Sequence, residues 1–262
     1  MFVDVSRSIA VQNVSKSYSG DGGSLRVLDE VSFDIAGSEF VALLGPSGCG
    51  KTTLLKILAG TVSADVGEIY AGETRLTGPS PDIAMVFQDF HLLPWKSVLE
   101  NVRVGIELQS ASNGDTGEAV ASEWLRKVGL EGVADSYPSE LSGGMKQRVG
   151  LARALAVDPD VLLMDEPFGA LDAQTKDRLQ TELLELWNAQ QKTILFVTHD
   201  IDEAIYLADR VLVLSEKPAT IVDEVEVPFE RPRWKRRVDI EGSSAFNRIK
   251  SRLRDELGLS VE

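Results

Sequence analysis

The stretch Gly45-Pro46-Ser47-Gly48-Cys49-Gly50-Lys51-Thr52-Thr53 decides how the rest of the chain is interpreted. It fits the phosphate-binding pattern in which two glycines, separated by four residues, are followed by lysine and then by serine or threonine. An apolar run over residues 39–44 predicts a buried strand before it, and residues 53–59 predict a helix after it. In this setting the loop N–H groups and the helix N-terminus point at one anion. The stretch predicts a nucleoside triphosphate site, in which Lys51 reaches the β- and γ-phosphates and Thr52 joins the Mg²⁺ shell.

Two carboxylates follow a second apolar strand. Residues 161–164 are apolar and lead directly into Asp165 and Glu166. A buried strand that delivers a carboxylate beside a phosphate loop suits Mg²⁺, so we expect Asp165 to hold the metal directly or through water. Glu166 would then face the γ-phosphate and polarise the attacking water. The alternative role for such carboxylates is to cap a following helix.

His199 follows a third apolar strand, over residues 193–197. Strands and helices alternate from residue 158 to residue 214, which indicates a parallel sheet with ligands bound at the carboxyl ends of its strands. A lone histidine is usually structural. At the end of this strand, however, His199 is placed to contact the γ-phosphate.

Ser142, Gly143 and Gly144 open another predicted helix, which Asp158-Pro159 ends. Ser142 is a good N-cap, so one interpretation is simply a capped helix. Two adjacent glycines exceed what a cap needs, and they free backbone N–H groups to approach a second anion. The residues alone leave both interpretations open.

The first part of the chain predicts antiparallel strands. Residues 9–14, 31–35 and 69–76 have strand patterns, the second of them by alternation of apolar and polar side chains. Tyr18 follows the first strand in a polar, glycine-rich turn. Its ring is expected either in the core or stacked on the base of a nucleotide.

Gln88 comes directly after an apolar strand, residues 83–87, and begins an aromatic, proline-broken stretch that runs to Trp95. This much apolar surface indicates either packing in the core or contact with a partner. Residues 109–119 are small and polar, and predict a mobile surface loop.

Composition narrows the class of protein. Of the 262 residues 43% are hydrophobic, which is ample for a core, yet no apolar run approaches the roughly 18 residues of a membrane helix. The net charge of −14 argues against sequence-independent binding to nucleic acid and predicts a soluble acidic surface, with a salt-rich cytoplasm as a second explanation. Cys49 is the single cysteine, so an intrachain disulfide is excluded and a reducing, cytoplasmic compartment is expected.

The chain beyond residue 230 predicts a short extension. Residues 231–237 carry five positive charges and no negative one. This basic run could touch lipid headgroups, although a solvated linker is the role we expect. Residues 244–256 predict a terminal amphipathic helix.

Together these stretches resemble the ATP-binding cassette (ABC) ATPases over nearly the whole chain. The matching residues are Gly45 to Thr52, Gln88, Leu141 to Gln147, Val161 to Glu166, Leu171-Asp172 and His199. The resemblance implies an α/β P-loop NTPase fold with a RecA-like core, an N-terminal antiparallel β subdomain and an inserted α-helical subdomain over about residues 89–157. It places the ATPase domain in residues 1–230 and a short C-terminal extension in residues 231–262.

The resemblance also implies roles for individual residues. Tyr18 stacks on adenine, and Gln88 senses the γ-phosphate and Mg²⁺ and contacts the membrane partner. The segment 142–144 binds the ATP held by the other subunit, and Asp172 reaches across the dimer. Each ATP then lies between two cassettes, so hydrolysis requires a head-to-tail dimer of identical or homologous subunits.

The stretches 87–95 and 165–172 are similar to a narrower group, the importer ATPases for nitrate, sulfonate, taurine and bicarbonate. In such importers the ATPase is a separate chain at the cytoplasmic face of the membrane, and it pairs with permeases that a solute-binding protein serves. The competing interpretation is a soluble cassette protein of DNA repair or translation. The acidic charge opposes it, and so does the lack of room for a second cassette or a long coiled coil. A third class, a non-catalytic binding module, would lack Glu166 or His199.

Overall fold

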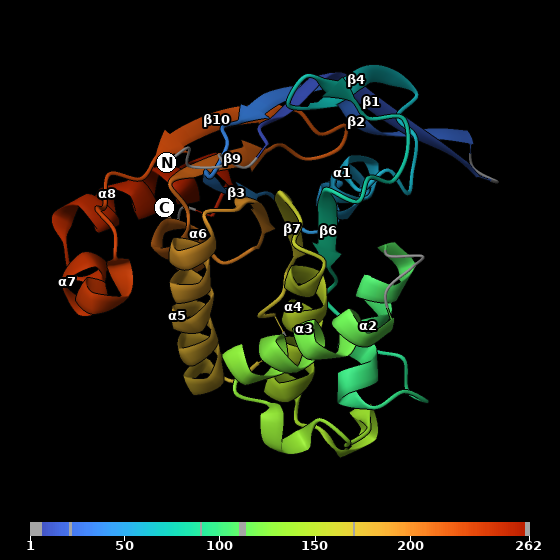
Figure 1. The fold of residues 1–262 in the computed structure, drawn as a ribbon. Coiled ribbons are helices and arrows are strands. Elements are labelled where there is room, and N and C mark those ends of the chain that lie inside the picture. Colours follow the sequence, from blue (N-terminus) through green and yellow to red (C-terminus); the bar gives the residue numbers. More distant parts are fainter. Residues whose placement is uncertain (1–6, 21–22, 90, 110–113, 170, 260–262) are drawn as a thin grey trace.

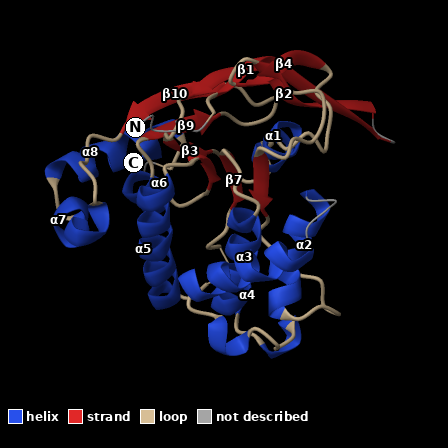
Figure 2. Ribbon diagram, viewed as in Figure 1, coloured by secondary structure: helices blue, strands red, loops and turns tan. Residues whose placement is uncertain are grey.

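The computed structural model describes residues 7–20, 23–89, 91–109, 114–169 and 171–259. In these residues the strands form two sheets, one of six strands in the order β10-β9-β3-β8-β7-β6 and one of four in the order β2-β1-β4-β5. Figure 2 shows the strands along the top of the molecule, with helices below and beside them. Among the described residues, no helix combines the length and the apolar character needed to cross a lipid bilayer.

The six-stranded sheet is mainly parallel. Its strands are β3 (Phe40–Leu44), β6 (Ile83–Val86), β7 (Val161–Asp165), β8 (Thr193–Val197), β9 (Arg210–Leu214) and β10 (Ile221–Glu226). β10 runs antiparallel to β9, and the other neighbouring pairs are parallel. Every residue of β3, β7 and β8 is buried, as expected of parallel strands covered on both faces. The predicted parallel sheet is confirmed.

Two hydrophobic cores lie on the two faces of this sheet. Phe40, Ala42 and Leu44 of β3 belong to one core, and Val41 and Leu43 belong to the other. This division follows from the strand period, because successive side chains point to opposite faces.

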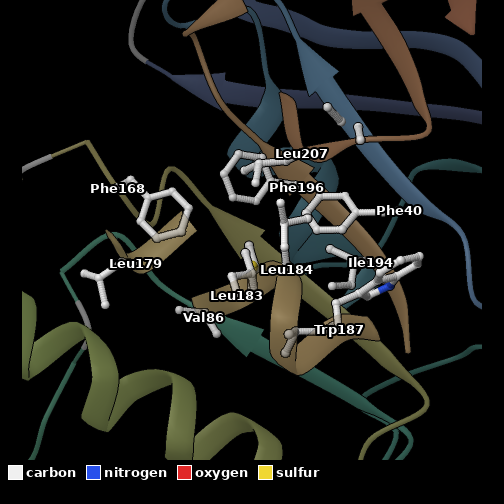
Figure 3. Close-up of a cluster of buried hydrophobic side chains, with 14 of the residues drawn as sticks. Phe40, Val86, Phe168, Leu179, Leu183, Leu184, Trp187, Ile194, Phe196 and Leu207 are labelled. Carbon is white, nitrogen blue, oxygen red and sulfur yellow. The ribbon is translucent and has the colours of Figure 1, made fainter. Parts of the chain in front are cut away.

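The first core is covered by α5 (Ala173–Gln190) and α6 (Ile201–Leu207). Figure 3 shows Trp187 of α5 beside Phe40, and the two ring centroids are 6.0 Å apart. Leu179, Leu183 and Trp187 are all buried, and their spacing of four residues places them on one face of the helix. That spacing is why the middle of α5 packs against the sheet.

The second core encloses α1 (Lys51–Leu58) between the two sheets, and Figure 1 shows α1 beneath β1, β2 and β4. The four-stranded sheet consists of β1 (Ile9–Gly20), β2 (Gly23–Ile35), β4 (Val66–Ala71) and β5 (Thr74–Arg75). Its pairs are antiparallel, as the sequence predicts.

The predicted turn around Tyr18 is wrong. β1 continues to Gly20, and Tyr18 pairs with Leu25 of β2. The register of the β1–β2 pair shifts three times between Val11 and Ser17. Such bulges interrupt the alternation of apolar and polar side chains, so the second half of the strand does not show the usual pattern.

Three helices pack together below the parallel sheet (Figure 1): α2 (Val98–Gln109), α3 (Gly114–Lys127) and α4 (Gly143–Ala156). The short 3₁₀ turns η1 (Glu131–Val133) and η2 (Pro138–Glu140) connect α3 to α4. The predicted loop over residues 109–119 is largely wrong, because α2 reaches Gln109 and α3 begins at Gly114; residues 110–113 lie outside the described residues. Ala121, Trp124 and Leu125 of α3 are buried, and this packing stabilises a helix whose first turns are polar.

The C-terminal segment forms η3 (Arg233–Arg236), α7 (Arg237–Glu241) and α8 (Ser244–Glu256). α8 confirms the predicted terminal helix. The Ser243 side chain caps it by accepting a hydrogen bond from the N–H of Phe246, at 3.1 Å. Phe246 and Leu253 are buried, so one face of the helix packs against the rest of the protein.

The prediction that the basic run 231–237 is a solvated linker is also wrong. Arg233 is 1% exposed, and its guanidinium donates hydrogen bonds to the carbonyl oxygens of Tyr206 and Ala208, at 3.2 and 2.5 Å. Those carbonyls lie at the C-terminus of α6, where a helix leaves its last carbonyls without intrahelical partners. Arg233 also pairs with Asp209 at 3.2 Å. The arginine thus completes the end of a buried helix.

Arg233→Ala is expected to lower the free energy of unfolding by about 3–5 kcal/mol, because it leaves buried carbonyls and Asp209 without their partner. Burial lowers the pKa of Arg233 to about 10, so the guanidinium still carries its charge at neutral pH. Denaturant unfolding followed by circular dichroism measures the effect. Lys235→Ala, at an exposed position of the same run, is the control and is expected within about 0.5 kcal/mol of the wild type. Equal midpoints for the two variants would contradict the structural role of Arg233.

Candidate functional site

The phosphate loop connects β3 to α1 and has the curled backbone that its glycines permit. Gly48 and Gly50 have φ angles of 74° and 129°, which L side chains rarely adopt. A Cβ on Gly50 would in addition lie 2.9 Å from Val27 Cγ1. α1 begins at Lys51, and among the described residues no side chain caps it by a hydrogen bond. Its first N–H groups are therefore placed to receive an anion.

A pocket of about 530 Å³ opens over this loop, a volume typical of small-molecule sites. It is lined by Tyr18, Leu25, Val27, Ser47, Gly48, Gly50, Lys51, Thr52, Thr53, Gln88, Glu166 and Lys217. Tyr18 and Leu25 are 42% and 54% exposed, so Tyr18 is not a core residue. The Tyr18 ring offers a flat apolar surface at a distance along the chain from the anion-binding loop. The pocket thus combines the two surfaces that a nucleotide requires.

Lys51 lies at the base of the pocket and is 6% exposed. Its Nζ donates hydrogen bonds to the carbonyl oxygens of Gly45 and Pro46, at 2.7 and 3.0 Å. A buried ammonium group needs such acceptors. The phosphate loop itself therefore holds the lysine charge beside the position of the phosphates.

Asp165 is the last residue of β7 and is 8% exposed. Burial raises the pKa of its carboxyl, and a hydrogen bond from the Thr52 side chain acts in the opposite direction. A buried carboxylate beside a hydroxyl on the phosphate loop is a set of hard oxygen donors, which fits Mg²⁺.

Glu166 turns its side chain toward the pocket. Its φ is 43°, uncommon for a residue with a side chain, and its N–H donates to the carbonyl of Val197 at 3.0 Å. One oxygen of its carboxylate, Oε2, lies 3.0 Å from Nδ1 of His199. His199 is 64% exposed and Glu166 22% exposed. The structure therefore brings two of the predicted catalytic side chains into contact.

Gln88 approaches the same place from the end of β6. A Cβ built on Gly169 would lie 3.7 Å from Gln88 Nε2 and 3.8 Å from Glu166 Oε2. The two side chains therefore reach the same side of the Gly169 backbone. Gln88, Glu166 and His199 converge although 78 and 33 residues separate them in the chain.

Three predicted ligand-binding residues of the phosphate loop do not line the pocket. Cys49 is 2% exposed and packs in the core between the two sheets, so its backbone but not its thiol can meet a phosphate. Gly45 and Pro46 use their carbonyls to hold Lys51.

Four further predicted residues form a second cluster outside the pocket lining. Ser142 caps α4 by accepting a hydrogen bond from Met145 N–H at 3.3 Å, and Asp172 caps α5 through Thr175 N–H at 3.0 Å. A Cβ on Gly144 would lie 2.8 Å from Thr175 Cγ2, so this glycine allows the two helix starts to approach. Gly143 is exposed. The cluster presents its backbone to solvent rather than to the pocket of its own chain.

Leu25, Val27 and Lys217 line the pocket, and the sequence pattern does not indicate them. Leu25 is opposite Tyr18 in the β1–β2 pair. Lys217 lies in the loop between β9 and β10, which is joined to β2 by a hydrogen bond from Ala219 N–H to the Val27 carbonyl, at 2.9 Å. A complete β1–β2 hairpin in the prediction would have identified Leu25, but Lys217 depends on tertiary contacts.

Comparison with known proteins agrees with this site. The ABC transporter family model matches residues 28–169. An ABC transporter ATP-binding protein of Methanocaldococcus jannaschii, of uncharacterised role, is 45% identical over 97% of this chain and 94% of its own length. The bicarbonate transport ATP-binding protein of Synechocystis is 44% identical over 88% and 82% of the two chains. The aliphatic sulfonates import ATP-binding protein of Bacillus cereus is 43% identical over 94% of each chain.

Solved structures show the same fold. The dimeric structure of a bacterial ABC transporter cassette has a TM-score of 0.76 and 33% identity, and the match covers 85% of this chain and all of the other. The post-hydrolysis state of that cassette, bound to ADP and phosphate, has a TM-score of 0.75 and 32% identity. The predicted P-loop NTPase fold is confirmed, and the transport names of the relatives favour transport over DNA repair or translation. The chain belongs to the ATP-binding proteins of the ABC transporter family, which bind and hydrolyse ATP.

Proposed function

We propose that this protein is the ATP-hydrolysing subunit of an importer, in which two cassettes act beneath a separate membrane permease. The solute is a small anion of the class that includes nitrate, sulfonates, taurine and bicarbonate. Relatives at 43–44% identity that are named for sulfonate and bicarbonate transport support this class. The subunit then works at the cytoplasmic face of the membrane, held there by the permease, and meets the solute-binding protein only through it.

The observation that carries the proposal is the separation of two groups of residues. Tyr18, the phosphate loop and Glu166 surround one pocket. The segment 142–144 and Asp172 form a cluster of their own, and Gly143 and Asp172 are exposed. A second cassette in head-to-tail orientation brings that cluster to the open side of the pocket, so that each ATP is enclosed by two subunits.

Within the pocket each side chain has a distinct task. Lys51 binds the β- and γ-phosphates, while Thr52, Asp165 and Gln88 supply oxygen ligands for Mg²⁺. Bound Mg²⁺ would neutralise charge on the phosphates. Glu166 accepts the proton of the attacking water. His199 donates through Nδ1 to Glu166, 3.0 Å away, which leaves Nε2 for the γ-phosphate.

The other end of the pocket holds the nucleoside. Tyr18 stacks on adenine, with Leu25 and Val27 beside it. Lys217 is exposed at this end and supplies a positive charge to the ribose and α-phosphate, which an ADP and an ATP share.

The pairing of cassettes is tested by the dependence of turnover on protein concentration. If each site needs residues 142–144 of another copy, specific ATPase activity rises in proportion to protein concentration while dimers are a minority. Static light scattering on the same samples reports the oligomeric state. A constant specific activity across a dilution series in which only monomers are present would contradict the shared site.

The permease is expected to dock on the segment that runs from Gln88 to Trp95. Trp95 is 71% exposed, so the interpretation that it belongs to the core is wrong. The loop that carries it is rigid: the buried Asn101 side chain accepts from Leu93 N–H at 2.7 Å and donates to the Lys96 carbonyl at 3.0 Å. An exposed tryptophan on a rigid loop is typical of an interface anchor.

Trp95→Ala is expected to weaken binding to the permease by on the order of 2 kcal/mol, about 30-fold in affinity. ATP affinity is expected to stay unchanged, because Trp95 is outside the pocket. Co-purification with the permease and nucleotide titration measure the two effects. Val238→Ala, at an apolar position of α7 that is 84% exposed, is the control. Normal co-purification of the Trp95 variant would remove the docking role.

A further inference from the structure

A buried polar network joins α5 to α6 directly behind His199. Lys176 Nζ lies 2.7 Å from Asp200 Oδ2 and 3.3 Å from Glu203 Oε1. Gln180 donates to the same Glu203 oxygen at 2.8 Å. The side chain of Glu203 is 4% exposed and that of Lys176 is 21% exposed. Charges this deeply placed keep fixed partners, because separation would leave a carboxylate buried alone.

The network fixes the residues on both sides of His199. Thr198 donates its hydroxyl to Glu203 Oε2, and the same hydroxyl accepts from Asp200 N–H at 3.1 Å. Asp200 also caps α6 by accepting from Glu203 N–H at 3.2 Å. His199 itself is 64% exposed, so little packing around the ring holds it. Its orientation toward Glu166 depends on the backbone that Thr198 and Asp200 fix.

The other end of the network lies at the start of α5. Lys176 is in the first turn of that helix, and its N–H donates to the carbonyl of the N-cap Asp172 at 2.9 Å. Asp172 belongs to the cluster proposed to face the other cassette. The network therefore joins the part of the chain expected to meet the second subunit to the part expected to meet the γ-phosphate.

We propose that Lys176 is a positioning residue for hydrolysis, which holds His199 in contact with Glu166 through Asp200 and Glu203. This inference rests on the proposed roles of His199 and Glu166. The alternative is that the ion pairs only stabilise the fold. The two differ in what Lys176→Met does to the histidine ring and to turnover when the nucleotide still binds.

The chain contains two histidines, His91 and His199, which makes the ring directly observable. In ¹⁵N-histidine NMR spectra of the full chain, Lys176→Met is expected to shift the His199 ring signals and to leave those of His91 unchanged. Turnover is expected to fall by about 10- to 100-fold, as for other misplaced catalytic groups, with ATP affinity unchanged. Lys176→Arg is expected to restore both the ring signals and most of the rate. Spectra of His199→Ala assign the two sets of signals.

Lys250→Met is the matched control. Lys250 pairs with Asp202, also on α6, at the same 2.7 Å distance, but from α8. It is expected to keep wild-type turnover and wild-type His199 signals. If Lys176→Met proves too unstable to purify, Lys176→Met with Glu203→Gln removes both charges together. The same shift of His199 and the same loss of rate are then expected.

Wild-type turnover in Lys176→Met, or unchanged His199 signals in it, would overturn the inference. Shifts of both histidines together with loss of ATP affinity would overturn it too, because they indicate general destabilisation. Turnover of His199→Ala separates the two levels. An inactive His199→Ala beside a normal Lys176→Met refutes only the positioning role, whereas a fully active His199→Ala refutes the proposed catalytic pair itself.

Discussion

Glu166→Gln is expected to stop ATP turnover while leaving ATP bound. The amide is nearly isosteric with the carboxylate but cannot accept a proton from the attacking water. Loss of a general base typically lowers the rate by about 10²–10⁴, which is roughly 3–5 kcal/mol of barrier. Lys51 and Asp165 lie elsewhere in the site and remain in place, so the phosphates and the metal keep their ligands. Loss of a negative charge near the γ-phosphate also favours ATP.

With hydrolysis stalled, a dimer with ATP enclosed between two cassettes is expected to accumulate. Gel filtration with MgATP would show an early-eluting species for Glu166→Gln and a mainly monomeric one for the wild type. Nucleotide retained in the early fraction identifies the complex. Hydrolysis at a near wild-type rate would mean that another residue is the base.

Lys51→Ala is expected to have the opposite effect on binding. Its Nζ is held 2.7 Å from the Gly45 carbonyl, where it meets the phosphates. Hydrogen bonds to charged groups contribute about 1.5–3 kcal/mol each, so loss of the ammonium is expected to weaken ATP binding by about 10²–10³-fold. Dimer formation with MgATP is lost with it.

Lys56→Ala is the control for this variant, since Lys56 is on the same helix but exposed and outside the pocket. Isothermal titration measures ATP affinity for both. Equal affinity of the Lys51 and Lys56 variants would contradict the placement of the phosphates over the loop.

Features that depend on consecutive residues were predictable from the sequence. The phosphate loop needs its glycines, Lys51 and Thr52 in one short stretch, with a strand before it and a helix after it. Asp165 and His199 were predictable for a second reason. In a parallel sheet the carboxyl ends of the strands meet at one edge, so residues that follow β7 and β8 come close to the loop that follows β3.

Features that depend on tertiary contacts were not predictable. The strand around Tyr18 escaped because bulges break its alternation. Lys217 reaches the pocket only because its loop is joined to β2, about 190 residues earlier in the chain. Arg233 is buried because the end of α6 needs donors, and no local pattern distinguishes such an arginine from a solvated one.

The segment 142–144 shows how two interpretations of one motif can both apply. Ser142 caps α4, as the simpler interpretation requires. Gly144 is needed where Thr175 approaches, so packing explains one of the two glycines without any ligand. Gly143 is exposed, and a Cβ there would meet Leu171 at an ordinary 3.6 Å. Its position is therefore open to a side chain on structural grounds, and a substitution there tests the anion-binding role alone.

The shared site is tested most directly by mixing two inactive variants. Lys51→Ala destroys the phosphate loop, and Gly143→Asp places a negative charge where the other subunit's triphosphate is expected. Neither variant alone is expected to hydrolyse ATP, although Gly143→Asp should still bind it. In an equal mixture, half of randomly formed dimers are mixed, and each of these has one site with an intact loop and an intact segment 142–144. ATPase activity of about a quarter of the wild-type level is therefore predicted for the mixture. No activity in a mixture of folded variants, or hydrolysis by Gly143→Asp alone, would contradict a site built from two copies of the chain.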